Sequence, residues 1–303
     1  MKTTKLEMLL VALISLGLTT STKVLAEDTA LPEKPQEQSE ATESVQPEVD
    51  KQSTGKAVDK RQKILAEAGV ALDETAKALK ALDEDKPEDA LAALETATGK
   101  LELILARDPG LALAPVDVEV VTYDLLASLD TVKAMIEEAE DYLEDGEVQK
   151  ARPLVANLAS EIQFRTTSIP LATYPDAIKA ITPLIDEGKL DEAGAALHAA
   201  LNTLVVSTDE VLPLPKLRAE RLLENAEALA ENEKRTLKDN ETLANLLTEA
   251  RNQLKMAELL GYGTKESYKP MYEQLDQIEA KTVGGKGGKG WFDRIKEQLS
   301  ELL

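Results

Sequence analysis

Apolar residues recur at intervals of three and four along most of the chain, and short polar stretches separate these runs. Such spacing places the apolar side chains on one side of an α-helix, where they can be buried together. The pattern predicts helices over about residues 57–82, 87–105, 125–145, 151–162, 215–232 and 243–260, with others beside Gly188 and around Tyr268–Ile278. The chain is therefore expected to be built mainly of amphipathic helices.

One turn signature occurs three times, as ALDEDKPEDALAAL (81–94), YLEDGEVQKARPL (142–154) and LIDEGKLDEAGAAL (184–197). Each has an alanine five residues after Asp85, Gly146 or Gly188. Glycine ends a helix cheaply because it adopts a left-handed backbone, and a small alanine lets two helices approach closely. The signature predicts antiparallel helical hairpins that turn at these positions.

The segments between the hairpins contain a second repeated feature. TTSIPL (166–171) and STDEVLPL (207–214) each end in an apolar residue, a proline and a leucine, and the two triplets lie 43 residues apart. We expect ordered connectors here, and the alternating valines Val116, Val118 and Val120 are not enough to predict a sheet. A helical solenoid is an alternative, but the long proline-containing connectors favour an all-α fold in which antiparallel hairpins pack as a bundle.

The first 56 residues have the features of a leader followed by a tether. Lys2 and Lys5 precede the apolar run MLLVALISLGL, and Val24-Leu25-Ala26 resembles a peptidase site, so residues 1–26 are predicted to be a signal peptide. A retained membrane anchor is the alternative, although the run is short for a membrane of ~30 Å. Residues 27–56 are rich in carboxylates and proline and predict a disordered acidic tether. The helical domain is assigned to residues 57–281.

The C-terminal end combines a glycine-rich segment with a short amphipathic helix. VGGKGGKG predicts a flexible linker over residues 282–290, and residues 291–303 predict a helix that it tethers. The apolar side of that helix is a candidate partner-docking surface, formed by Trp291, Phe292, Ile295, Leu299 and Leu302. A helix this short is marginal alone in water, so it is expected to dock on a partner protein, on its own bundle or oligomer, or on a membrane surface.

Charge and composition narrow the range of functions. The formal net charge of −21 argues against nucleic-acid binding, and it favours cations or basic partners. The sequence has no cysteine, so disulfides and thiolate chemistry are excluded. With a leader and no later apolar run long enough to span a membrane, we expect a periplasmic chain with no transmembrane segment once the leader is removed.

The sequence offers few side chains for catalysis. His198 is the only histidine, and it is a candidate pH-sensitive residue because its ordinary pKa lies near neutral pH. Carboxylates cluster around residues 137–145, but without the spacing of a calcium loop, and GGKGGKG lacks the spacing of a phosphate loop. We therefore predict no catalytic, cofactor-binding or metal-binding residues and expect that the protein is not an enzyme.

The chain from about Lys60 to Glu279 resembles the YfdX family of exported bacterial proteins. The resemblance rests on DKPEDALAALETA (85–97), DEGKLDEAGAAL (186–197) and DEVLPLPKLRAERLLENA (209–226), in that order. It implies an all-helical periplasmic protein associated with stress, acid stress in particular, that forms homo-oligomers and has no established catalytic residue. The acidic tether, the polar stretch EKRTLKDNE and the terminal helix depart from the family pattern.

Two functions remain open from the sequence. The first is a non-enzymatic periplasmic stress-response protein that acts through protein–protein contacts, with a link to acid. The alternative is a small-ligand or cation-binding protein whose site lies in a groove between helices, which the acidic surface favours.

Overall fold

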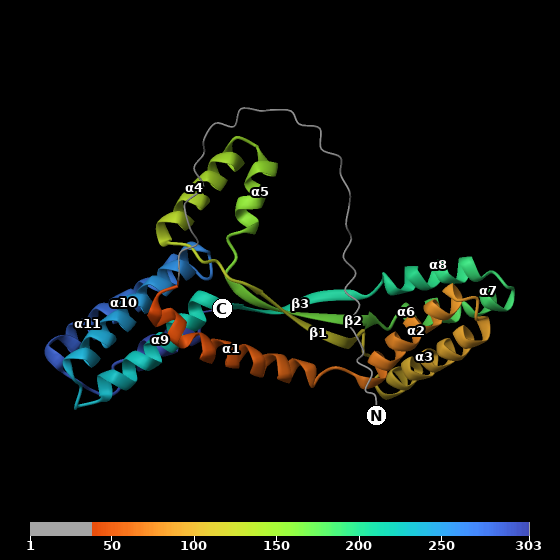
Figure 1. Ribbon diagram of the computed structural model, residues 1–303, viewed down its shortest axis with the longest axis horizontal. Helices are drawn as coiled ribbons and strands as arrows, with labels where there is room; N and C mark the ends of the chain where they lie inside the picture. Colours follow the sequence, from red (N-terminus) through yellow and green to blue (C-terminus); the bar gives the residue numbers. More distant parts are fainter. Residues whose placement is uncertain (1–37, 303) are drawn as a thin grey trace, which may run out of the picture. The chain divides into compact units, whose positions relative to one another are not determined.

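The computed structural model describes residues 38–302. The predicted signal peptide and residues 27–37 of the predicted tether lie outside this range. The described part is predominantly helical, which confirms the predicted fold class, and it also contains a small three-stranded antiparallel sheet (Figure 1). Within residues 38–302, every helix is too short or too polar to cross a lipid bilayer.

Three successive parts of the chain have the same order, a helical hairpin followed by one β-strand (Figure 1). The first unit is α2 (Ala66–Asp83), α3 (Pro87–Arg107) and β1 (Leu113–Tyr123), and the second is α4 (Leu129–Glu144), α5 (Val148–Ala156) and β2 (Glu161–Pro170). In the third, the first helix is divided into α6 (Tyr174–Lys179) and α7 (Thr182–Asp186), followed by α8 (Leu190–Leu201) and β3 (Val205–Pro213). The repeating unit therefore consists of a hairpin and a strand, and it occurs three times between residues 66 and 213.

The three predicted turns are confirmed. Asp85, Gly146 and Gly188 have φ angles of 56°, 75° and 73°, the left-handed conformation that the signature predicts. At each turn the following N–H donates to a carbonyl five residues back, at Lys86 N to Ala81 O (2.8 Å), Glu147 N to Tyr142 O (2.7 Å) and Lys189 N to Leu184 O (2.9 Å). This is the Schellman pattern, which satisfies carbonyls at the end of the first helix. The spacing shared by the three turns also places a buried alanine where the two helices cross, at Ala90, Ala151 and Ala193.

The connectors predicted from TTSIPL and STDEVLPL form strands β2 and β3, and the valines around Val118 lie in β1. The sheet order is β1-β2-β3, with Phe164 of β2 opposite Val120 on one side and Glu210 on the other. Pro170 and Pro213 are the last residues of their strands, where a missing N–H costs little pairing. The prediction of ordered connectors without a sheet is therefore corrected, because the β-branched residues of each strand pair with residues some 40 positions away in the sequence.

Apolar side chains gather in three clusters. The first and third hairpins share one cluster, which α2, α3 and α6–α8 build largely from alanine, leucine and isoleucine. A smaller cluster joins the sheet to α1 (Glu40–Arg61) and to the start of α9 (Leu214–Glu231). The remaining cluster contains α9, α10 (Leu237–Leu259), α11 (Lys265–Thr282) and α12 (Asp293–Ser300), with the short helix η1 (Val283–Gly285) after α11.

Residues 40–56 differ from the prediction of a disordered tether, because they form most of α1. Val45 and Val49 are fully buried, the first against the α9–α12 cluster and the second against the sheet. Residues 40–56 contain few apolar residues among many polar ones, so their composition alone indicates disorder. The segment is ordered because the rest of the chain supplies a surface for them.

The glycine-rich linker is also held in place. The N–H of Gly288 donates to the carbonyl of Ala230 at 3.2 Å, and Arg235 donates to the carbonyl of Lys286 at 2.6 Å. A Cβ atom at Gly288 would collide with the ring of Trp291. The glycines here allow close packing, in contrast to the flexible linker that their composition predicts.

Candidate functional site

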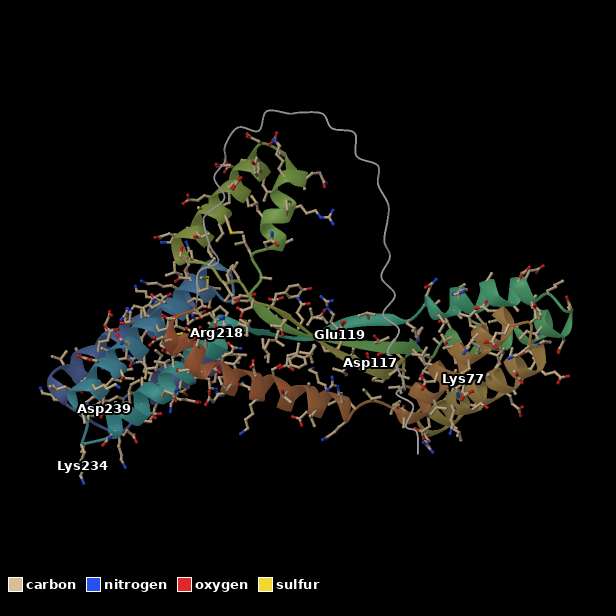
Figure 2. The ribbon with its side chains drawn as sticks, viewed as in Figure 1. Lys77, Asp117, Glu119, Arg218, Lys234 and Asp239 are labelled. Carbon is tan, nitrogen blue, oxygen red and sulfur yellow. The ribbon has the colours of Figure 1, made fainter. Side chains whose placement is uncertain are left out.

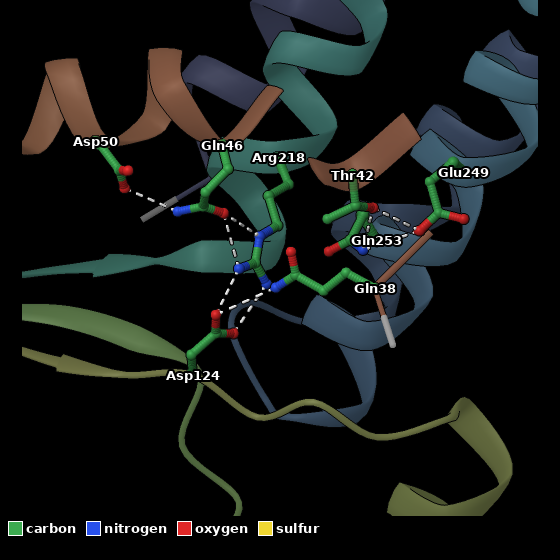
Figure 3. A network of polar contacts seen from close by, with 8 residues as sticks. All are labelled: Gln38, Thr42, Gln46, Asp50, Asp124, Arg218, Glu249 and Gln253. Atoms are coloured by element: carbon green, nitrogen blue, oxygen red, sulfur yellow. Dashed lines mark hydrogen bonds and ion pairs between the residues drawn. The ribbon is translucent and has the colours of Figure 1, made fainter. Parts of the chain in front are cut away.

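The most extensive buried polar contacts surround Arg218 in α9, at the end of the sheet (Figures 2 and 3). Its guanidinium donates to both carboxylate oxygens of Asp124, at 3.0 and 2.7 Å, and twice to the side-chain oxygen of Gln46, at 3.1 and 2.9 Å. Only 3% of Arg218 is exposed. Because Asp124 follows β1 and Gln46 lies in α1, this arginine joins three elements that are far apart in sequence.

A second set of hydrogen bonds lies beside the first (Figure 3). Thr42 of α1 donates to Glu249 of α10 at 2.9 Å, and Gln253 donates to the same carboxylate oxygen at 3.1 Å. Arg218 of the first set and all three residues of the second line a cavity of about 420 Å³ between α1, α9, α10 and the loop that leads into α4. Since Asp124, Glu249 and Arg218 already bond to groups of the chain, the geometry indicates a structural junction more than a charged ligand site.

Tyr262 connects the C-terminal helices to the start of β2. Its hydroxyl donates to Glu161 at 2.7 Å and accepts the N–H of Ser160 at 3.0 Å. Burial and the neighbouring Glu161 carboxylate raise the pKa of Tyr262 well above its ordinary value. The phenol is thus protonated at physiological pH and keeps its hydrogen bond to Glu161, which is consistent with a structural role.

The candidate partner-docking residues at the C-terminus pack within the chain. Phe292, Ile295 and Leu299 are fully buried, Leu302 is 4% exposed, and all four belong to the cluster with α9–α11. Trp291 is half-buried, with the ammonium group of Lys281 5.6 Å from its ring centre. Of the docking alternatives that the sequence left open, the structure has the helix docked on its own bundle.

His198, the candidate pH-sensitive residue, is exposed on α8, away from the Arg218 contacts. Among residues 38–302, the histidine and the carboxylates form no group of three or more that could hold a metal ion. The structure therefore brings His198 together with none of the other candidate residues named from the sequence.

A different surface is exposed on the second hairpin, α4–α5. Leu143, Val148 and Val155 are 50%, 55% and 53% exposed, and we call these three residues the hairpin surface. Val132, Ala139 and Ala151 are the buried residues of these two helices, and they belong to none of the three clusters. A hairpin with so little burial and so many exposed aliphatic side chains is typical of a surface that contacts another protein.

The apolar spacing over residues 151–162, which include Val155, predicts a buried stripe, but Val155 is 53% exposed. Periodicity identifies the side of a helix that is apolar, but it does not identify what covers that side. No signal in the sequence identifies the hairpin surface, because Leu143 stands at the same position relative to its turn as Leu82 and Ile185, which are 5% and 3% exposed.

The model of the YfdX protein family matches residues 71–210. These residues run from within α2 to within β3, so the match extends over nearly all of the three hairpin-and-strand units. This part of the chain matches the YfdX family. The family resemblance predicted from the turn and connector motifs is thus confirmed over these residues, while all of α1 and the helices after β3 lie beyond the matched residues.

Among solved structures, YfdX of Salmonella Typhi is similar to the chain at 16% sequence identity and a TM-score of 0.36. The similarity covers 50% of this chain and 93% of that one. No match was found among curated proteins.

Proposed function

We propose that the protein is a non-enzymatic periplasmic component of a bacterial stress response and acts through contacts with other protein chains. The observation that carries this proposal is the hairpin surface, where three aliphatic side chains within the YfdX-family part of the chain are each at least half exposed. Exposed aliphatic residues gathered on one element favour protein contacts over contacts with small polar molecules.

Other features support the remaining parts of the proposal. The leader-like N-terminal sequence favours export, and one histidine with no cysteine leaves few of the side chains that enzymes commonly use. The net charge of −21 supports a link to acid, because protonation of carboxylates would reduce repulsion between the protein and an acidic partner.

Photo-crosslinking in living cells tests the proposed contacts. A benzophenone amino acid at Val155 should form adducts with a protein chain, because its side chain lies on the hairpin surface. The same amino acid at Leu237, which is 84% exposed but lies on α10, is the matched control and should form few or none. Equal labelling at both positions, or adducts at neither, would contradict the proposal.

A further inference from the structure

The segment between α11 and α12 is basic, although the chain as a whole is strongly acidic. Residues 280–292 contain three lysines and no carboxylate, whereas the formal net charge of the chain is −21. Lys281, Lys286 and Lys289 are all exposed. Among the ion pairs of residues 38–302, none includes any of these three lysines. Their ammonium groups are therefore available to an anionic partner.

The backbone that carries these lysines is held against the loop after α9. The guanidinium of Arg235 in that loop donates to the carbonyls of Leu229 and Ala230 at 2.8 and 2.6 Å, and also to the carbonyl of Lys286. A fourth positive charge thus lies beside the lysines. Because the backbone is already ordered, binding through this segment does not require a flexible linker to be fixed first.

Apolar groups lie among the lysines. Val283, which stands between Lys281 and Lys286 in the sequence, is 70% exposed. Lys281, Lys286 and the half-buried Trp291 line an open hollow of about 560 Å³. The ammonium group of Lys281 lies 5.6 Å from the centre of the indole ring. Tryptophan beside lysine is typical of a membrane surface, where the indole lies among lipid headgroups and the ammonium group reaches the phosphates.

We propose that residues 281–291 bind the surface of a membrane that contains anionic lipids. The three lysines contact lipid phosphates, and Val283 and Trp291 enter the headgroup region. Attachment of this kind commonly combines an apolar contact with basic residues, and both are present here. The exposed valine and the indole favour a lipid surface over a soluble anion such as inorganic phosphate, which offers no apolar contact.

The acidity of the rest of the chain does not prevent this contact. At physiological ionic strength the Debye length is about 8 Å, so carboxylates much farther than this from a lipid phosphate are screened. Of the carboxylates that flank the segment in sequence, Glu279 pairs with Arg251 at 3.1 Å, so the flanking Asp293 stands against three lysines. The segment lies beyond the matched residues 71–210 and on different elements from the hairpin surface, so this proposal is independent of the proposed function.

Tryptophan fluorescence tests the contact directly, because Trp291 is the only tryptophan in the sequence. The chain from Glu27 onward, which lacks the apolar run of the predicted leader, is mixed with vesicles of phosphatidylglycerol and phosphatidylcholine in equal parts. The emission should shift to shorter wavelength, and brominated lipid should quench it, because the indole enters a less polar environment. Vesicles of phosphatidylcholine alone, or inorganic phosphate alone, should change the emission little. No shift with the anionic vesicles, or an equal shift with either control, would contradict the proposal.

Charge reversal tests which lysines are responsible. Lys281→Glu/Lys286→Glu should raise the dissociation constant for the anionic vesicles about thirtyfold or more, since two attractive charges are lost and two repulsive ones are added. Lys77→Glu/Lys80→Glu is the matched control, because it changes the net charge equally at side chains of α2 that are 66% and 77% exposed, and it should bind as the wild type does. Both variants should unfold at the wild-type temperature, since all four side chains are exposed. Equal weakening by the two variants would show that net charge alone governs binding, and unchanged binding by the first would show that this segment does not contact lipid.

Discussion

Replacing Phe292 by alanine is expected to lower the free energy of unfolding by about 4 kcal/mol, the usual cost of removing a large aromatic side chain from a core. Phe292 is fully buried in the cluster with α9–α11, and so are Ile295 and Leu299 of the following helix. Lys296 pairs with Glu227 of α9, and Lys216 donates to the carbonyl of Leu302 at 2.7 Å. The C-terminal helix is therefore part of the fold, and chemical denaturation should show the loss.

Val283→Ala is the matched control, because this side chain is 70% exposed and lies in the segment between α11 and α12. Its stability should stay within about 0.5 kcal/mol of the wild type. If Phe292→Ala were equally mild, the terminal helix would not be docked on its own bundle, and its docking on a partner would be favoured again.

Replacing Arg218 by leucine should lower the free energy of unfolding by about 3 kcal/mol, since removal of one member of a buried ion pair leaves the other without a partner. Asp124 would lose two hydrogen bonds and Gln46 would lose two more. The cost is placed at the lower end of the usual range because the Asp124 side chain is 30% exposed and keeps some contact with water.

The double variant Arg218→Leu/Asp124→Leu distinguishes the effect of an unpaired Asp124 carboxylate from the effect of lost side-chain packing. If the unpaired carboxylate causes the loss, the double variant should be more stable than Arg218→Leu alone. Arg294→Ala, at an exposed arginine of α12, is the control and should be close to neutral. An Arg218→Leu chain as stable as this control would show that the junction contributes nothing to the fold.

The hairpins were predictable because their determinants are local. A left-handed residue, a crossing alanine and apolar positions all lie within a stretch of 13 or 14 residues, and each of the three stretches forms the turn that its pattern predicts. The family resemblance followed from the same motifs, since they carry most of the distinctive sequence.

The strands, α1 and the Arg218 junction could not be predicted in the same way. Each depends on partners that are distant in sequence, such as Asp124 and Arg218, which are 94 residues apart. The short apolar triplets of β2 and β3 resembled connectors because a strand needs its neighbours to be recognised. In α1, Val45 and Val49 are ordered by surfaces that other elements provide.

The most direct test of the central claim, that the hairpin surface is covered by protein in the cell, is thiol protection at Leu143. A Leu143→Cys chain should react slowly with N-ethylmaleimide in intact cells and rapidly when purified and diluted, whereas Leu237→Cys should react rapidly in both settings. Equal reaction of the two cysteines in intact cells would show that nothing covers the hairpin surface and would contradict the account.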